Sequence, residues 1–149
     1  MSAIVRLEPW HIPAIDLQPS QAGAMGIYAP AQTEDYGAWL VNSGPAWALV
    51  EDGRVLGAAG FTEIFATQAS AWAMFSGDIG GHARAIVRQV RKVLAMALWP
   101  RIEAMTRASC PAHGRFARAC GFTHVADLRA CGPACETMQL WEVVNAKSA

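Results

Sequence analysis

The pattern of hydrophobic and polar positions in the first third of the chain predicts a strand and two helices. An apolar run at residues 3–7 predicts a strand, which Pro9 ends. A first helix is expected over residues 11–17. Residues 18–32 are rich in Gly, Ala and Pro and predict irregular structure. Thr33, followed by two acidic residues, is typical of a helix start, because its side chain can cap the first turn.

Three strands are predicted next. Two apolar runs within residues 46–64 flank Asp52-Gly53, a residue pair that favours a type I′ hairpin turn. A third apolar run, at residues 69–76, predicts the strand that follows.

A glycine pair, Gly80 and Gly81, then opens a strongly amphipathic helix that Pro100 blocks. We interpret the basic side of this helix as a solvated face, and nucleic acid as an improbable partner because no aromatic residues interleave with the cations. The apolar stripe consists of Ala83, Ile86, Val87, Val90, Val93, Leu94 and Ala97, and the basic side of Arg84, Arg88, Arg91 and Lys92.

The last third predicts a strand at residues 101–106, a helix that begins near Pro111 and ends at Gly121, and strands at residues 122–128 and 135–144. A helix between strands in this order implies a mixed sheet with helices on its faces. The fold class is therefore α/β, with about six or seven mostly antiparallel strands.

Composition fits one globular domain spanning residues 1–149. Hydrophobic residues make up 53% of the chain, and 12 basic side chains balance 12 acidic ones. The net charge therefore indicates neither nucleic acid nor membrane as a partner. The start of the chain lacks a signal-peptide pattern, so a cytoplasmic protein, or one packaged from the cytoplasm, is expected. The strand positions of Trp47, Trp72 and Trp141 favour burial.

The cysteines are expected to be buried, reduced thiols, because a cytoplasmic chain of this size rarely forms disulfides. A zinc site is the alternative, completed by His113 or His124. It is disfavoured because only two of the cysteines are close in sequence, so no metal is expected. The cysteines are Cys110, Cys120, Cys131 and Cys135.

The order of elements, together with the hexapeptide DIGGHA, resembles the GNAT (GCN5-related N-acetyltransferase) fold. The family motif is Gln/Arg-x-x-Gly-x-Gly/Ala, whose backbone N–H groups bind the pyrophosphate of acetyl-CoA. Gly81 and Ala83 match it, whereas Asp78 reverses the sign of the expected residue. A tight strand-to-helix corner is the alternative interpretation of the glycines. The resemblance implies cofactor-binding roles for Asp78, Gly80, Gly81, His82, Ala83 and Arg84.

A second motif lies in CPAHGRFARACGF, where the family has an Asn, then a Tyr that acts as general acid before a Gly-Phe pair. Gly121 and Phe122 match, but Cys110 replaces the Asn and Ala117 the Tyr. A base for the acceptor amine is still required for direct transfer. The candidates are Glu63, by its place in the chain, and His113. Ordinary surface chemistry is the alternative for both.

The same segment is most similar to GNAT-like proteins of tailed bacteriophages, including internal virion proteins, through His113, Arg115, Phe116 and Gly121. That similarity implies a phage or prophage origin. It also implies a virion or morphogenesis role with weak or no transferase activity, through contacts with phage structural proteins or self-association. The alternative function is an active acetyl-CoA-dependent N-acetyltransferase acting on an unknown amine.

Overall fold

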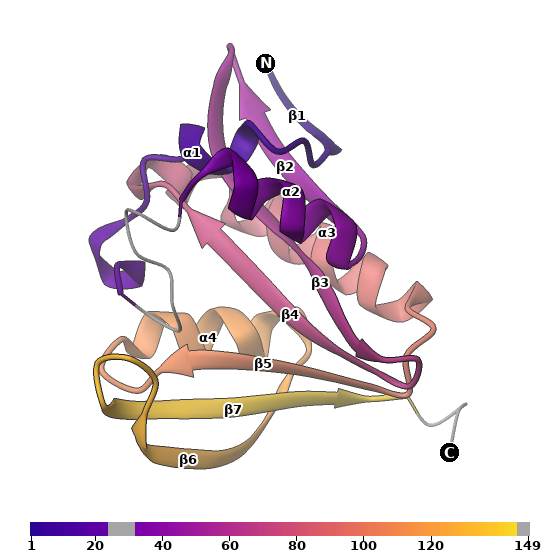
Figure 1. Cartoon of the computed structure of the whole chain (residues 1–149), viewed down its shortest axis with the longest axis vertical. Coiled ribbons are helices and arrows are strands. Elements are labelled where there is room, and N and C mark those ends of the chain that lie inside the picture. Colours follow the sequence, from indigo (N-terminus) through magenta and orange to yellow (C-terminus); the bar gives the residue numbers. More distant parts are fainter. Residues whose placement is uncertain (24–31, 146–149) are drawn as a thin grey trace. The chain divides into compact units, whose positions relative to one another are not determined.

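The computed structural model describes residues 1–23 and 32–145 of the chain (Figure 1). Within these residues, the strands form one seven-stranded sheet in the order β1-β2-β3-β4-β5-β7-β6. β4 and β5 pair in parallel, whereas β1–β2, β2–β3, β5–β7 and β7–β6 are antiparallel. This confirms the predicted α/β class. The strands are β1 (Ser2–Arg6), β2 (Ala46–Glu51), β3 (Arg54–Phe65), β4 (Gln68–Phe75), β5 (Arg101–Arg107), β6 (Thr123–Cys131) and β7 (Glu136–Val144).

The helices occupy the connections that the sequence predicted. Thr33 caps α2, since its Oγ1 accepts a hydrogen bond from the backbone N–H of Tyr36 at 3.1 Å. Gly121 ends α4 in a left-handed conformation at φ 107°. The helices are α1 (His11–Ala14), α2 (Glu34–Ser43), α3 (Ala83–Met96) and α4 (Pro111–Cys120), with 3₁₀ segments η1 (Pro19–Gln21) and η3 (Gly77–His82).

Contacts group the chain into two compact units, and β3 and β4 each contribute residues to both. The first unit comprises residues 1–62 and 71–80. Its core lies where α1 and α2 cover strands β2 to β4 (Figure 1). The predicted hairpin turn is confirmed, because Asp52 and Gly53 both have positive φ, at 49° and 80°. Core side chains of this unit include Ile12, Leu40, Ala48, Val55 and Met74.

The second unit comprises residues 63–70 and 81–149. Here α4 packs on β5 and β6 and contacts α3. The Arg91 guanidinium of α3 donates to the Ala119 carbonyl oxygen of α4 at 3.0 Å, while its helix keeps the predicted basic face exposed. Buried side chains of this unit include Ile102, Ala117, Phe122, Met138 and Trp141. The expectation of a single domain over residues 1–149 stays a prediction.

Several boundaries differ from the predicted ones. Helix α1 ends at Ala14, and part of the predicted irregular segment forms η1, while its residues 24–31 lie outside the described part of the chain. Helix α3 ends at Met96, four residues before Pro100. Ala97 is already extended, and the Asn145 side-chain amide donates to the Trp99 carbonyl oxygen at 2.8 Å in the segment that follows.

Burial also differs from expectation for the cysteines and tryptophans. Only Cys120 is buried among the cysteines, and this burial raises the pKa of its thiol to about 11. Trp141 is buried at 3% exposure, whereas Trp47 and Trp72 are half-buried. The buried-thiol expectation was therefore wrong for the remaining cysteines, which lie at helix and strand ends where solvent reaches them.

Candidate functional site

The segment that enters α3 begins at Ser76, directly after β4. Ser76 is 2% exposed, and its backbone N–H donates to the Leu56 carbonyl oxygen at 2.8 Å. Its Oγ accepts a hydrogen bond from the backbone N–H of Asp78 at 3.2 Å. Ser76 therefore fixes the start of η3 to the neighbouring strand, and the glycines follow from a defined position.

The glycines of η3 have open space around them. A side-chain Cβ built on Gly77, Gly80 or Gly81 would meet no other atom within 4 Å. None of the three has a positive φ. Neither backbone conformation nor packing within the described residues therefore requires glycine at these positions. What glycine does provide there is room for another molecule to approach the backbone.

The charge of Asp78 is balanced by a residue that the sequence reasoning missed. The Arg54 guanidinium donates to Asp78 Oδ2 at 2.6 Å, and both side chains are about two-thirds exposed. Arg54 follows the hairpin turn at the start of β3, 24 residues before Asp78. Only the register of β3 beside β4 brings the two together, so no local sequence signal could have found this pair.

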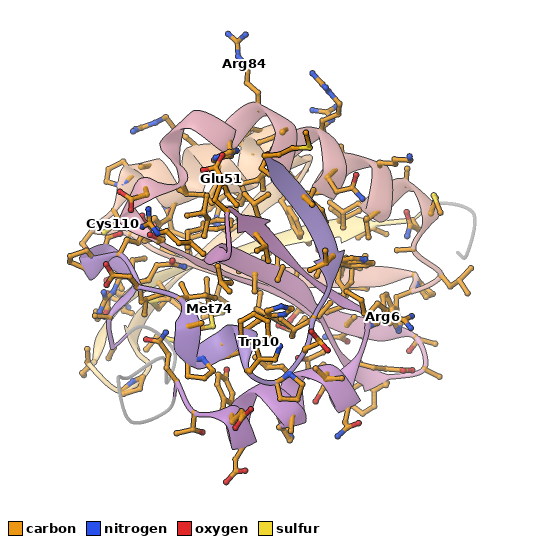
Figure 2. The ribbon with its side chains drawn as sticks, turned by 90° about the horizontal axis from the view of Figure 1, so that it is seen from above. Arg6, Trp10, Glu51, Met74, Arg84 and Cys110 are labelled. Carbon is orange, nitrogen blue, oxygen red and sulfur yellow. The ribbon has the colours of Figure 1, made fainter. Side chains whose placement is uncertain are left out.

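The remaining predicted cofactor residues lie at the junction of η3 and α3. His82 is the N-cap residue of α3 and provides no side-chain cap. Ala83 begins the helix, and both Ala83 and Arg84 are exposed. Figure 2 shows the Arg84 side chain extending outward from the helix. Asp78, Gly80, Gly81, His82, Ala83 and Arg84 thus form one continuous segment.

The two predicted bases lie on different elements of the second unit. Glu63 is exposed near the end of β3, before the turn into β4, whereas η3 follows the far end of β4. His113 is half-buried on α4, and burial lowers its pKa, with a further contribution from the Arg107 charge. His113 therefore favours the neutral form, which a base requires.

One face of α4 carries both His113 and the position of the missing acid. His113 and Ala117 are four residues apart, so they lie on the same side of the helix. Ala117 is 6% exposed and has no proton to donate. The structure therefore places an imidazole one turn before the alanine on this face.

Two further properties concern metals and membranes. Within residues 1–23 and 32–145, no group of three or more His, Cys, Asp or Glu side chains is placed to hold a metal ion. Across the same residues, every helix is too short or too polar to span a bilayer. The absence of a metal stays a prediction.

Comparison with solved structures identifies the architecture. The Salmonella typhimurium protein yncA, solved with its cofactor acetyl-CoA, matches with a TM-score of 0.76 at 13% identity, over 99% of this chain and 96% of that one. An N-acetyltransferase of Staphylococcus aureus Mu50 matches with a TM-score of 0.74 at 17% identity, over 97% and 98%. The chain has the GNAT fold.

A GNAT-family acetyltransferase of Streptococcus pneumoniae gives the same result, with a TM-score of 0.71 at 9% identity over 97% of this chain and 99% of that one. No protein-family model and no curated protein matches the sequence. At these identities the GNAT likeness is one of fold.

Proposed function

We propose that this GNAT-fold chain is an acyl-CoA-dependent N-acyltransferase whose segment from Gly77 to Arg84 binds the cofactor pyrophosphate. The open space at Gly77, Gly80 and Gly81 carries the proposal, since nothing within the described residues accounts for glycine at these positions. A diphosphate needs such space to reach backbone N–H groups at a helix start, where the helix dipole also favours an anion. Acetyl-CoA supplies the acyl group as a thioester.

Charge at the segment is compatible with this ligand because Arg54 pairs with Asp78. A lone carboxylate would repel a diphosphate by roughly 1 kcal/mol at 4 Å in water. The guanidinium at 2.6 Å offsets that repulsion. The reversed sign in the hexapeptide therefore does not by itself oppose cofactor binding.

Proton transfer from the acceptor amine is assigned to His113. Burial lowers the pKa of His113 and favours its neutral form, and a neutral imidazole can accept a proton. With Ala117 in the place of an acid, this face of α4 would supply no proton to a leaving thiolate, and solvent would have to provide it. Glu63 is the alternative base.

A second function is favoured by Ala117 itself. A GNAT fold without an acid at this position is also what a binding protein without transfer activity would show, and a virion or morphogenesis protein of a phage is the specific form of this alternative. It predicts no binding of acetyl-CoA at millimolar concentration.

Isothermal titration with acetyl-CoA tests the proposal, and we expect micromolar affinity. Arg54→Gln leaves the Asp78 carboxylate unbalanced, so affinity should fall about five-fold. Asp78→Asn should raise it by a similar factor, and the double variant should return close to the wild-type value. Arg6→Gln removes an exposed cation from β1 and is the matched control, with unchanged affinity.

Urea unfolding of the same variants separates binding from stability. The Arg54–Asp78 pair is exposed, so the free energy of unfolding of each variant should lie within about 1 kcal/mol of the wild-type value. No heat and no thermal shift at millimolar acetyl-CoA would reject the enzymatic proposal and favour the binding protein. Equal weakening by Arg6→Gln would reject the role of the pair.

A further inference from the structure

A cavity of about 370 Å³ lies in the second unit, beside α4 and strands β6 and β7. Its volume falls within the range of small-molecule sites. None of the cofactor-segment residues lines it, and neither His113 nor Ala117 of α4 is among its lining residues. The lining residues are Ala108, Pro111, Gly114, Arg115, Arg118, His124, Asp127, Gln139 and Trp141.

A β-bulge in β6 builds the floor of this cavity. His124 pairs with Trp141 and Ala126 with Leu140, so Val125 is the extra residue. Without it, His124 and Asp127 would point to opposite faces, because side chains alternate along a strand. With it, Asp127 lies opposite Gln139 on the cavity face. The bulge therefore brings His124 and Asp127 to the same cavity.

Hydrogen bonds and a close helix contact position the residues of β7 that line the cavity. The Trp141 indole N–H donates to Thr106 Oγ1 at 2.8 Å, and Thr106 Oγ1 donates to Gln139 Oε1 at 3.3 Å. Gly114 of α4 lies so close that a Cβ there would meet the Trp141 ring at 3.0 Å. The amide oxygen of Gln139 thus accepts a hydrogen bond from Thr106, which orients the Gln139 side chain.

Two guanidinium groups border the cavity without an acidic partner. The Arg118 guanidinium carbon lies 5.6 Å from the centre of the Trp141 ring, which positions it by a cation–π contact. Among the described residues, neither Arg115 nor Arg118 forms an ion pair. By contrast, Arg101 pairs with Glu103, and Arg107 pairs with Glu136 at 2.9 Å.

The one carboxylate of the cavity is already engaged. Asp127 Oδ1 contacts His124 Nε2 at 2.9 Å, and the His124 ring meets the edge of Trp141 with centres 5.3 Å apart. The charged side chains of the lining that have no partner of opposite charge within the described residues are therefore the two arginines, Arg115 and Arg118. Trp141 is 3% exposed, so little of its surface faces solvent. The unpaired arginines therefore favour an anionic group at this cavity.

We propose that this cavity is a second binding site, for a small organic molecule that carries a carboxylate or phosphate group. Arg118 and Arg115 bind the anionic group through charge-assisted hydrogen bonds, and Gln139 lines the same cavity. The His124–Asp127 pair lies beside the anion and sets the size of the molecule that fits. This site is independent of the proposed cofactor segment.

Isothermal titration with inorganic phosphate and with succinate, at ionic strength matched with sodium chloride, tests the site. We expect saturable binding of at least one of these probes, and which one binds distinguishes phosphate from carboxylate ligands. Arg118→Gln should weaken binding about ten-fold, by loss of a charge-assisted hydrogen bond. Asp127→Asn should strengthen it about three-fold, by removing the neighbouring negative charge.

The two variants should change the affinity for the probe in opposite directions. A general loss of structure would weaken binding in both. Arg88→Gln removes an exposed cation from α3 and is the matched control, with unchanged affinity. In NMR spectra, the indole N–H signal of Trp141 should shift with added probe in the wild type and not in Arg118→Gln. Binding indistinguishable from chloride would overturn the proposal. Binding that Arg118→Gln leaves unchanged would overturn it equally, and would place the anion elsewhere, for instance at the glycines.

Discussion

The glycine segment and the α4–β6–β7 cavity differ in how their charges and their space are used. At the segment, Arg54 is committed to Asp78, both side chains are exposed, and the glycines leave open room. At the cavity, Arg118 is positioned over a buried tryptophan and has no acidic partner among the described residues. The glycine segment would bind an anion through its backbone N–H groups, and the cavity would bind one through its side chains.

The difference shows that the sign of a residue alone does not decide whether an anion binds. Taken alone, the Asp78 carboxylate disfavours anion binding. Taken alone, Arg115 and Arg118 of α4 are ordinary surface residues. Arg54 neutralises Asp78, whereas Arg118 has no acidic partner in the part of the chain that the structure describes. A paired charge acts weakly on a bound anion and an unpaired charge acts strongly. The two regions also differ in their relation to the core, and this difference can be measured.

Truncation of the cavity floor should have the largest effect. Trp141→Ala removes a buried ring that packs against Gly114 and bonds to Thr106, so the free energy of unfolding should fall by about 3–5 kcal/mol. Trp39 is 54% exposed, so Trp39→Ala should lower the free energy of unfolding by less than about 1 kcal/mol. Urea denaturation measures both. Equal losses would show that Trp141 is no more structural than a surface ring.

Glycine substitutions should have an intermediate effect and separate the glycine segment from packing glycines. A Cβ at Gly37 would lie 2.2 Å from the Pro9 carbonyl oxygen, so Gly37→Ala should destabilise by about 1–3 kcal/mol. Gly80→Ala meets open space and should change stability by less than about 0.5 kcal/mol. Thermal and urea unfolding check this pair. A large loss at Gly80 would mean that the glycine serves the fold.

A pH series should give the smallest effect, from one histidine in each unit. Burial lowers the pKa of His11, whose Nδ1 accepts the Glu8 backbone N–H at 2.9 Å, and burial likewise lowers the pKa of His113. Below pH 6.5 the unfolded chain therefore binds protons that the folded chain does not, and stability should fall from pH 7 toward pH 5. His11→Gln should flatten the slope of unfolding free energy against pH. An unchanged slope would contradict the buried, neutral state of His11.

Local chemistry made most of the elements predictable. Asp52-Gly53, Thr33 and Gly121 each act through neighbours within a few residues, so the hairpin turn, the start of α2 and the end of α4 lay where the sequence placed them. The early end of α3 was not predictable, because the three residues between Met96 and Pro100 include neither Gly nor Pro.

The candidate site divided in the same way. The continuous segment from Asp78 to Arg84 was predictable from local residues, since a glycine pair between a strand and a helix is a local pattern. Two features became visible only in the folded chain: Arg54 balances Asp78, and a bulge turns Asp127 toward the cavity that Arg118 lines. Charge pairing and strand register depend on residues that are distant in sequence, and only the folded sheet brings them within hydrogen-bonding distance.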